Sequence, residues 1–419
     1  MKKNHFSFSE SNRRDLLRLG MFGIGVSAWA LPMPLFGQAA AALAGQAKQD
    51  GKILVVLELS GGNDGLNTLI PYGDDAYYRH RPTIGIPRKD LRPIDDHFGF
   101  SHGMAGFERL YKSGKLAIVH GCGYENPSFS HFTSMAYWHT AAPNSGEQYG
   151  WVGRLADAMA PDAPPNFIVN IDTKQSLAVR SRLHVPVVFD DPNKFTQEVF
   201  SDERDALQSM LSQEPNSSQI KNPSRQFLLE TAQSAKQASA LVREAWAKYH
   251  SPVDYGITGL DLPKVAALIE AGMPTRLYYT SYRNNAFDTH VFQNDTHKRL
   301  LTYASDAVTA FLEDLERIGR ADDVVLMAFS EFGRRVPENV NLGTDHGAAN
   351  LMFVAGKQVK GGQYGTVPSL TKLDAGDNLV YTTDFRRVYA TMIAGWLGYD
   401  DTRQLLNGDF ERFDMFRRA

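Results

Sequence analysis

The chain has 419 residues but only one cysteine, Cys122, and it has no excess of basic residues, since 44 Lys and Arg stand against 47 Asp and Glu. One cysteine excludes an intramolecular disulfide framework and a cysteine-rich zinc site. The formal charge of -3 argues against a general nucleic-acid-binding protein, which normally carries a basic excess. With 43% hydrophobic residues, the chain is apolar enough to fold. A metal ion in this protein would therefore need Asp, Glu, His or hydroxyl ligands.

The first 44 residues have the order of a secretory signal: basic side chains, an apolar stretch at 21–36, and small residues ending at Ala44. Arg13 and Arg14 resemble the paired arginines of a twin-arginine export signal. We therefore expect the twin-arginine translocase to export the folded protein to the periplasm, with residues 1–44 removed. The alternative is a membrane anchor. Two prolines in the apolar stretch disfavour it, so no stable membrane span is expected after cleavage.

Short apolar runs alternate with helical patterns along residues 45–419, which we interpret as one α/β domain. Strands separated by helices predict a doubly wound, mostly parallel sheet flanked by helices. A polar stretch at about 194–250 lacks strand signals and is interpreted as a helical insertion, or else as an ordinary pair of surface helices. The expected strands are 52–59, 116–120, 167–171, 276–280, 324–329 and 351–355, and the clearest expected helices are 106–113, 262–271, 291–318 and 384–397.

Two polar clusters follow the first two predicted strands. Ser60-Gly-Gly-Asn-Asp64-Gly directly follows the first strand, and the Asp64 carboxylate could bind a hard cation or cap a short helix. Ser130 lies where an amphipathic helix begins. Because a helix N-terminus favours anions, Ser130 is a candidate nucleophile for a phosphate-like centre, although a plain N-cap is the commoner role.

Two further clusters follow the fourth and fifth predicted strands. Asp288 and His290 are two residues apart, so in an extended segment they face the same way and could bind one metal. Their alternative is a capping Asp and a satisfied polar His. Glu331 and Arg334 end the fifth strand, and a later loop holds Asp345 and His346.

Glu331, Asp345 and His346 are further candidate metal ligands, and Arg334 or Arg335 could pair with an anionic substrate. The alternative here is a salt-bridged strand end followed by a loop. In an open α/β sheet, groups that follow parallel strands meet at one edge. Such a convergence of Asp, His and Glu is what a metal-assisted hydrolase needs.

The ordered motifs L-E-L-S-G-G-N-D-G-L-N-T, S-F-S-H-F, F-D-T-H, F-S-E-F-G-R-R and G-T-D-H-G resemble those of domain-of-unknown-function family 1501. That family is related to the alkaline phosphatase superfamily, which includes the sulfatases. The resemblance implies a doubly wound α/β core, twin-arginine export and a site for one or two divalent metals. It also departs from the superfamily, because Ser330-Glu331 stands where an Asp-His pair is usual. No C-x-P-x-R motif surrounds Cys122, which excludes formylglycine chemistry.

Carried over residue by residue, Ser130 resembles the hydroxyl nucleophile, and Asp288, His290 and His346 resemble the ligands of a first metal. Asp64 and Glu331 would then hold a second metal. Asp, Glu and His ligands favour zinc, manganese or iron over calcium or magnesium.

The leading hypothesis is an exported metal-dependent hydrolase of phosphate or sulfate esters, acting on a small anionic substrate. A second hypothesis is a catalytically degenerate envelope binding or assembly protein of the same fold. A third is a metal-free serine esterase using Ser60 or Ser130, which the lack of a G-x-S-x-G elbow disfavours.

Overall fold

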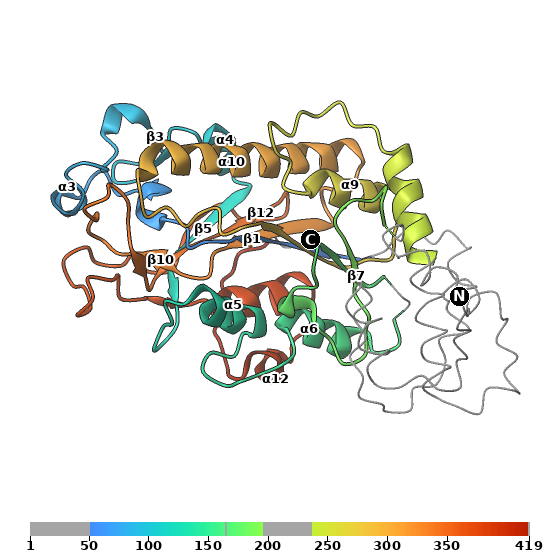
Figure 1. Cartoon of the computed structure of the whole chain (residues 1–419). Helices are drawn as coiled ribbons and strands as arrows, with labels where there is room; N and C mark the ends of the chain where they lie inside the picture. The colour runs from blue at the N-terminus through green and yellow to red at the C-terminus, as the bar shows by residue number, and fades with distance from the viewer. Residues whose placement is uncertain (1–50, 164–165, 196–236, 418–419) are drawn as a thin grey trace, which may run out of the picture.

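The computed structural model describes residues 51–163, 166–195 and 237–417, in which a nine-stranded sheet lies between two layers of helices (Figure 1). The predicted export signal at 1–44 lies outside the described residues, as does most of the predicted insertion at 194–250. Within that stretch, residues 237–248 are helical. In the described part of the chain, no helix has the length and apolar character needed to cross a bilayer.

The main sheet has the strand order β13-β5-β12-β9-β1-β8-β6-β7, with β14 beside β5. Every pairing is parallel except those of β12, which runs antiparallel to both β5 and β9. All six predicted strands are present, and the prediction of a mostly parallel sheet is confirmed. The strands are β1 (Ile53–Leu59), β5 (Leu116–Gly123), β6 (Ile168–Ile171), β7 (Val187–Phe189), β8 (Leu277–Tyr282), β9 (Val324–Phe329), β12 (Asn350–Ala355), β13 (Gly362–Tyr364) and β14 (Thr383–Asp384).

Two small sheets flank the main one. Strand β4 pairs with both β2 and β3 in one of them, and β10 pairs with β11 in the other. The β10–β11 pair sets Arg334 opposite His346. Their bounds are β2 (Leu69–Ile70), β3 (Leu91–Pro93), β4 (Gly99–Ser101), β10 (Gly333–Arg334) and β11 (His346–Gly347).

Strand β1 lies in the middle of the sheet, and all seven of its residues are buried. Its side chains alternate between two hydrophobic clusters, one on each face of the sheet. A strand covered on both faces needs a continuous apolar run, which explains why β1 does not alternate between apolar and polar residues.

Helices cover both faces, which confirms the predicted doubly wound arrangement. Figure 1 shows α4, α9 and α10 on one side of the sheet and α5, α6 and α12 on the other. On the first side lie α4 (Ala105–Lys112), α9 (Leu262–Glu270) and α10 (Gln293–Arg317); on the second lie α5 (His131–Thr140), α6 (Trp151–Met159), α11 (Arg386–Ala390) with a π-helical turn at Thr391–Trp396, and α12 (Thr402–Leu406). The remaining helical segments are α3 (Asp75–His80) and the 3-10 turns η2 (Gly65–Asn67), η3 (Arg88–Asp90) and η4 (Leu177–Val179).

Helix α5 is fixed to the sheet by an aromatic stack. The ring of Trp138 lies 4.2 Å from that of Phe385 and 5.3 Å from that of Phe329, and both pairs are stacked. Buried aromatic pairs of this kind contribute about 0.5–1.5 kcal/mol each beyond the area they bury. The first turn of α5, which carries His131, is thereby positioned against the end of β9.

Candidate metal centre

Polar groups gather at the carboxyl edge of the main sheet. Strands β1, β8 and β9 are parallel neighbours, so the segments that follow them meet at this edge. Strand β12 runs the opposite way, so its beginning lies at the same edge, together with the preceding His346. This reversal explains how a residue ahead of a strand joins residues that follow strands.

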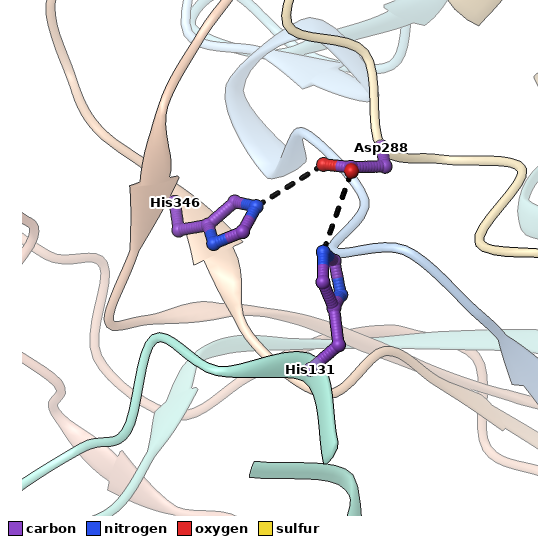
Figure 2. A group of neighbouring side chains, drawn as sticks. All are labelled: His131, Asp288 and His346. Carbon is purple, nitrogen blue, oxygen red and sulfur yellow. Dashed lines mark hydrogen bonds and ion pairs between the residues drawn. The ribbon is translucent and has the colours of Figure 1, made fainter. Parts of the chain in front are cut away.

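Three side chains place ligand-type atoms within 4.8 Å of one another: His131, Asp288 and His346. Figure 2 shows the two imidazole rings pointing at the Asp288 carboxylate from different elements. His346 Nε2 lies 3.1 Å from Asp288 Oδ1, and His131 Nε2 lies 3.4 Å from Asp288 Oδ2. His290 lies beside this group, with its Nε2 at 2.9 Å from Asp288 Oδ1 and 3.0 Å from His346 Nε2. We call these four residues the histidine centre.

Each imidazole of the histidine centre is bound through Nδ1 by an acceptor behind it. Carboxylate and carbonyl oxygens accept, so in a metal-bound form each Nδ1 would carry the hydrogen and each Nε2 would be left with its lone pair for a metal beside Asp288. Metal-binding histidines almost always have their other ring nitrogen occupied in this way. The acceptors are a Glu331 oxygen at 2.9 Å for His131, an Asp345 oxygen at 3.3 Å for His290 and the Phe129 carbonyl oxygen at 2.8 Å for His346.

Two observations test whether the histidine centre fits a cation. His131 Nε2 is buried and has no hydrogen-bond partner. In addition, His290 Nε2 and His346 Nε2 are only 3.0 Å apart, and two lone pairs at that distance repel unless a cation or proton lies between them. Ligands about 2.0–2.1 Å from one zinc ion would have a similar mutual spacing. The residues present therefore fit a divalent metal with nitrogen and oxygen ligands.

The charge states also suit metal binding. Burial alone would raise the pKa of Asp288, but hydrogen bonds from Arg334 and His346 and the nearby positive charges outweigh it and lower that pKa to about 2. Burial lowers the pKa of His346. The hydrogen bond to Glu331 raises the pKa of His131 against the effect of burial. An ionised Asp288 and a neutral His346 are the forms that bind metals.

Asp64 does not join the histidine centre, which corrects its prediction as a metal ligand. Its carboxylate is fully buried and binds Arg81 Nη1 at 2.6 Å, Gln293 Nε2 at 2.6 Å and the backbone N–H of Leu66 at 3.1 Å. Burial raises the pKa of Asp64, but the charge of Arg81 and its hydrogen bond outweigh this and lower it. Asp64 is thus one half of a buried ion pair and caps the turn η2, the alternative that the sequence left open.

Glu331 and Asp345 also differ from their predicted role as ligands, since both lie behind the histidines. Glu331 is fully buried, and besides His131 its carboxylate accepts the Gly61 backbone N–H at 2.8 Å. Asp345 accepts from His290 and from Asn339 Nδ2 at 3.1 Å. With Asp64 paired to Arg81 as well, the described residues do not form the predicted second metal site.

Arg334 is buried rather than available to a substrate anion, which corrects the prediction that it pairs with substrate. Its guanidinium donates to the carbonyl oxygens of Gly62 at 2.6 Å, Thr344 at 2.9 Å and Phe287 at 3.0 Å, and to Asp288 Oδ1 at 2.8 Å. Arg334 therefore ties together the loops that carry the histidine centre. Its neighbour Arg335 is exposed.

Ser130 is the N-cap residue of α5, as predicted, and is exposed. Its side chain makes no capping hydrogen bond, so the hydroxyl is not used to satisfy the helix terminus. It directly precedes His131 and so lies next to the histidine centre along the chain.

Two glycines allow the loops of this edge to approach closely. A Cβ on Gly61, whose φ is +117°, would lie 2.5 Å from the backbone N of Asp288. A Cβ on Gly343 would lie 2.3 Å from the carbonyl of His290. Neither position has room for a side chain.

Sequence reasoning placed Asp288, His290 and His346 together, and the structure brings these three together. His131 was not among the predicted ligands, because its neighbour Ser130 was the candidate nucleophile at the same helix start. The signal was available in the motif S-F-S-H-F, where a histidine opens the helix that follows a strand.

Comparison with protein-family models finds one match. The model of a family described as a protein of unknown function (DUF1501) matches residues 51–408. A comparison with curated proteins finds no match.

The chain is also similar to several solved structures. One is the PsFucS1 sulfatase from Pseudoalteromonas sp., with 11% identity, a TM-score of 0.38, and coverage of 92% of this chain and 75% of that chain. A second is the lipoteichoic acid synthase LtaP from Listeria monocytogenes, with 11% identity, a TM-score of 0.42, and coverage of 87% and 76%. A third is a protein in the alkaline phosphatase superfamily from Vibrio parahaemolyticus, with 10% identity, a TM-score of 0.35, and coverage of 76% and 63%. At these values the similarities do not assign the site.

Proposed function

The chain belongs to the DUF1501 family of proteins of unknown function, and we propose that it is an exported metal-dependent hydrolase of phosphate or sulfate esters. The observation that carries this proposal is the histidine centre, in which His131, His290 and His346 direct Nε2 toward the Asp288 carboxylate. These residues lie at the carboxyl edge of the α/β sheet, which is where substrates bind in this class of fold.

The metal would be held by Asp288 and by the three histidines. A bound divalent metal would supply positive charge that polarises the ester and stabilises the charge developing on its oxygens. A nitrogen-rich ligand set favours zinc, manganese or iron over calcium or magnesium.

Ser130 is the proposed nucleophile. Its hydroxyl is exposed at the N-terminus of the ten-residue helix α5, where backbone N–H groups and the helix dipole favour an anionic group. Attack by Oγ on phosphorus or sulfur would form a serine ester and break the bond to the alcohol. The hydroxyl gives up one proton and the leaving alcohol takes one, and water then hydrolyses the serine ester.

A second candidate function keeps the fold without catalysis, as a binding or assembly protein of the cell envelope. The observation that favours it is Arg334, whose Nη2 lies 2.8 Å from Asp288 Oδ1 and so already neutralises one ligand oxygen. Export by the twin-arginine translocase through residues 1–44 belongs to both proposals, and its support is the signal-like sequence itself.

The test measures metal content and ester hydrolysis on natively exported protein. We expect near-stoichiometric metal by mass spectrometry in the wild type and in H102A, which changes an exposed histidine outside the centre, but not in H131A. Hydrolysis of p-nitrophenyl phosphate or sulfate should stop on chelation and fall about a thousandfold or more in S130A.

Other outcomes separate the alternatives. A wild type without metal contradicts the metallohydrolase and favours the degenerate binding protein. Metal bound without hydrolysis of either ester also favours the binding protein. Hydrolysis that survives chelation and is lost in S130A identifies a metal-free serine esterase.

A further inference from the structure

Large apolar side chains are exposed around the histidine centre. Phe132 is 89% exposed, Phe292 71% and Val340 97%, and Phe129 and Val291 are also exposed. They account for five of the nine large hydrophobic side chains that are exposed in the described residues. Single exposed apolar residues are ordinary, but a gathering of them in one place marks a binding surface. We call these five residues the apolar rim.

The backbone places the apolar rim at the histidine centre. Phe129 and Phe132 flank His131 in the chain, and the Phe129 carbonyl oxygen accepts from His346 Nδ1 at 2.8 Å. The rim on this side is therefore part of the segment that orients two of the histidines.

The other rim residues lie on two loops that bind each other. Val291 and Phe292 directly follow His290, and the backbone N of Phe292 donates to the Asn341 carbonyl oxygen at 3.0 Å. Asn339 Nδ2 donates to the carbonyl oxygen of His290 at 3.0 Å. Val340 lies between Asn339 and Asn341, so it is held beside the segment that follows His290.

Phe292 is held in place at an energetic cost. Its φ of +45° lies in the left-handed region, which a bulky non-glycine residue rarely adopts. A backbone in this conformation costs on the order of 1–3 kcal/mol and persists only where surrounding structure imposes it. The strained backbone of Phe292 holds an exposed ring and not a buried one, so core packing does not explain it. This points to a use for the exposed ring.

We propose that the apolar rim binds the alkyl or aryl group of an amphiphilic ester whose anionic head lies against the histidine centre. The inference rests on the proposed function and adds the substrate class to it. One molecule with a charged head and an apolar tail would satisfy both the polar centre and its apolar surroundings. The rim has five side chains, far fewer than the roughly 20–30 residues that each partner contributes to a stable protein interface.

The experiment measures the affinity of non-hydrolysable alkylphosphonates, from methyl to butyl to octyl, below their micelle concentration. The protein is the mature full chain with its metal, and isothermal calorimetry gives the dissociation constants. Burying each CH2 group fully would tighten binding about fourfold, so even partial contact predicts octylphosphonate binding at least about tenfold tighter than methylphosphonate. Because no ester is cleaved, the result does not depend on catalysis.

Two variants test the rim, and one serves as the control. F132S removes the exposed ring in the first turn of α5, and F292N replaces the strained phenylalanine by a residue that tolerates the left-handed region. Both should flatten the dependence of affinity on chain length. I257S removes another exposed hydrophobic side chain, and it should keep the dependence. Its neighbour Gly256 lies near the middle of α10, since a Cβ on Gly256 would lie 3.3 Å from Asp306 Cβ.

Equal affinity for all three phosphonates overturns the inference and leaves the proposed function standing. A chain-length dependence that F132S and F292N retain overturns the rim as the binding surface. Sedimentation of the wild type, but not of F132S, with phosphatidylcholine vesicles and no preference for long phosphonates would make the rim a membrane contact and overturn the inference. Tighter octylphosphonate binding without hydrolysis of any ester supports the inference and contradicts the hydrolase.

Discussion

At the scale of single residues, the histidine centre depends on groups that do not face the proposed metal. His131 presents Nε2 because Glu331 accepts from its Nδ1. Metal-binding sites often lose about 10- to 100-fold in affinity when such an orienting partner is changed. The role of Glu331 can therefore be separated from that of a direct ligand.

The substitution E331Q should change the tautomer of the His131 imidazole. The glutamine amide can donate to Nδ1, which moves the ring hydrogen to Nε2 and blocks the lone pair that faces Asp288. We expect metal affinity to fall about 10- to 100-fold, measured by competition with a chromophoric chelator. H102A is the control, and an unchanged affinity in E331Q would mean that His131 does not bind the metal through Nε2.

A second residue-scale prediction concerns pH. His297 is buried in α10 with Nε2 at 2.9 Å from Asn63 Oδ1, and burial lowers its pKa from 6.5 to about 4 despite the nearby charge of Asp64. In the unfolded chain His297 is protonated near pH 6.5, whereas in the folded chain it is protonated only near pH 4. The contribution of His297 to stability is therefore fully present above pH 6.5 and is lost as pH falls from 6.5 to 4.

The variant H297Q tests this effect, since a glutamine amide can donate to Asn63 without titrating. Denaturant unfolding at several pH values should show the free energy of unfolding falling more steeply in the wild type than in H297Q between pH 6.5 and 4. Parallel curves for the two proteins would show that His297 is not buried as a neutral ring.

At the scale of elements, the site is assembled from three loops that all bind the guanidinium of Arg334. Arg334 donates to carbonyl oxygens in the loops after β1 and β8 and in the loop before β11. The antiparallel β12 and the β10–β11 pair bring the third loop to the edge where the first two end. The Arg334 guanidinium thus holds the three loops together through hydrogen bonds.

Replacing Arg334 by methionine should loosen all three loops together. The change leaves several buried carbonyl oxygens and Asp288 without their donor, so the free energy of unfolding should fall by about 3–5 kcal/mol. Hydrogen exchange should lose protection at 60–65, 287–290 and 344–347. The matched control is R335M, which removes an exposed neighbour; equal effects of the two variants would contradict the tethering role of Arg334.

At the scale of the whole molecule, the proposed ligands come from segments far apart in the chain. His131 begins α5, Asp288 and His290 lie between β8 and α10, and His346 lies in β11. A metal bound to all of them would cross-link the fold and bind only the folded state. Metal should then stabilise the entire domain and not only its own loops.

This prediction is measured by thermal unfolding with and without added metal. At a free metal concentration of 100 times its dissociation constant, the wild type should gain about 2.7 kcal/mol, while D288A should gain nothing. H102A should respond like the wild type. A stabilisation of equal size in D288A would place the metal elsewhere.

The strands and most helices could be predicted from the sequence because continuous apolar runs and helical periodicity are local patterns. The continuous apolar run of β1 needs only its own residues to indicate a strand covered on both faces. The same holds for the long amphipathic helix α10 and for Ser130 as the start of α5. Residues that follow parallel strands also share an edge by topology, which predicted that the polar clusters converge. The grouping of His346 with Asp288 and His290 around one metal came from the resemblance to family 1501.

The roles of individual charged groups were decided only by the tertiary structure. Asp64 and Asp288 both follow central strands, and each is paired with a buried arginine, Asp64 with Arg81 and Asp288 with Arg334. Only Asp288 also faces histidines, because His131 and His346 reach its two oxygens. Glu331 became the partner of His131, and Arg334 became a tether, because their partners come from distant segments. Local sequence indicates which segments form buried strands and amphipathic helices, since periodicity depends on neighbours along the chain. The function of a charge depends on the opposite charge that folding brings within a few ångströms, and no local pattern contains that information.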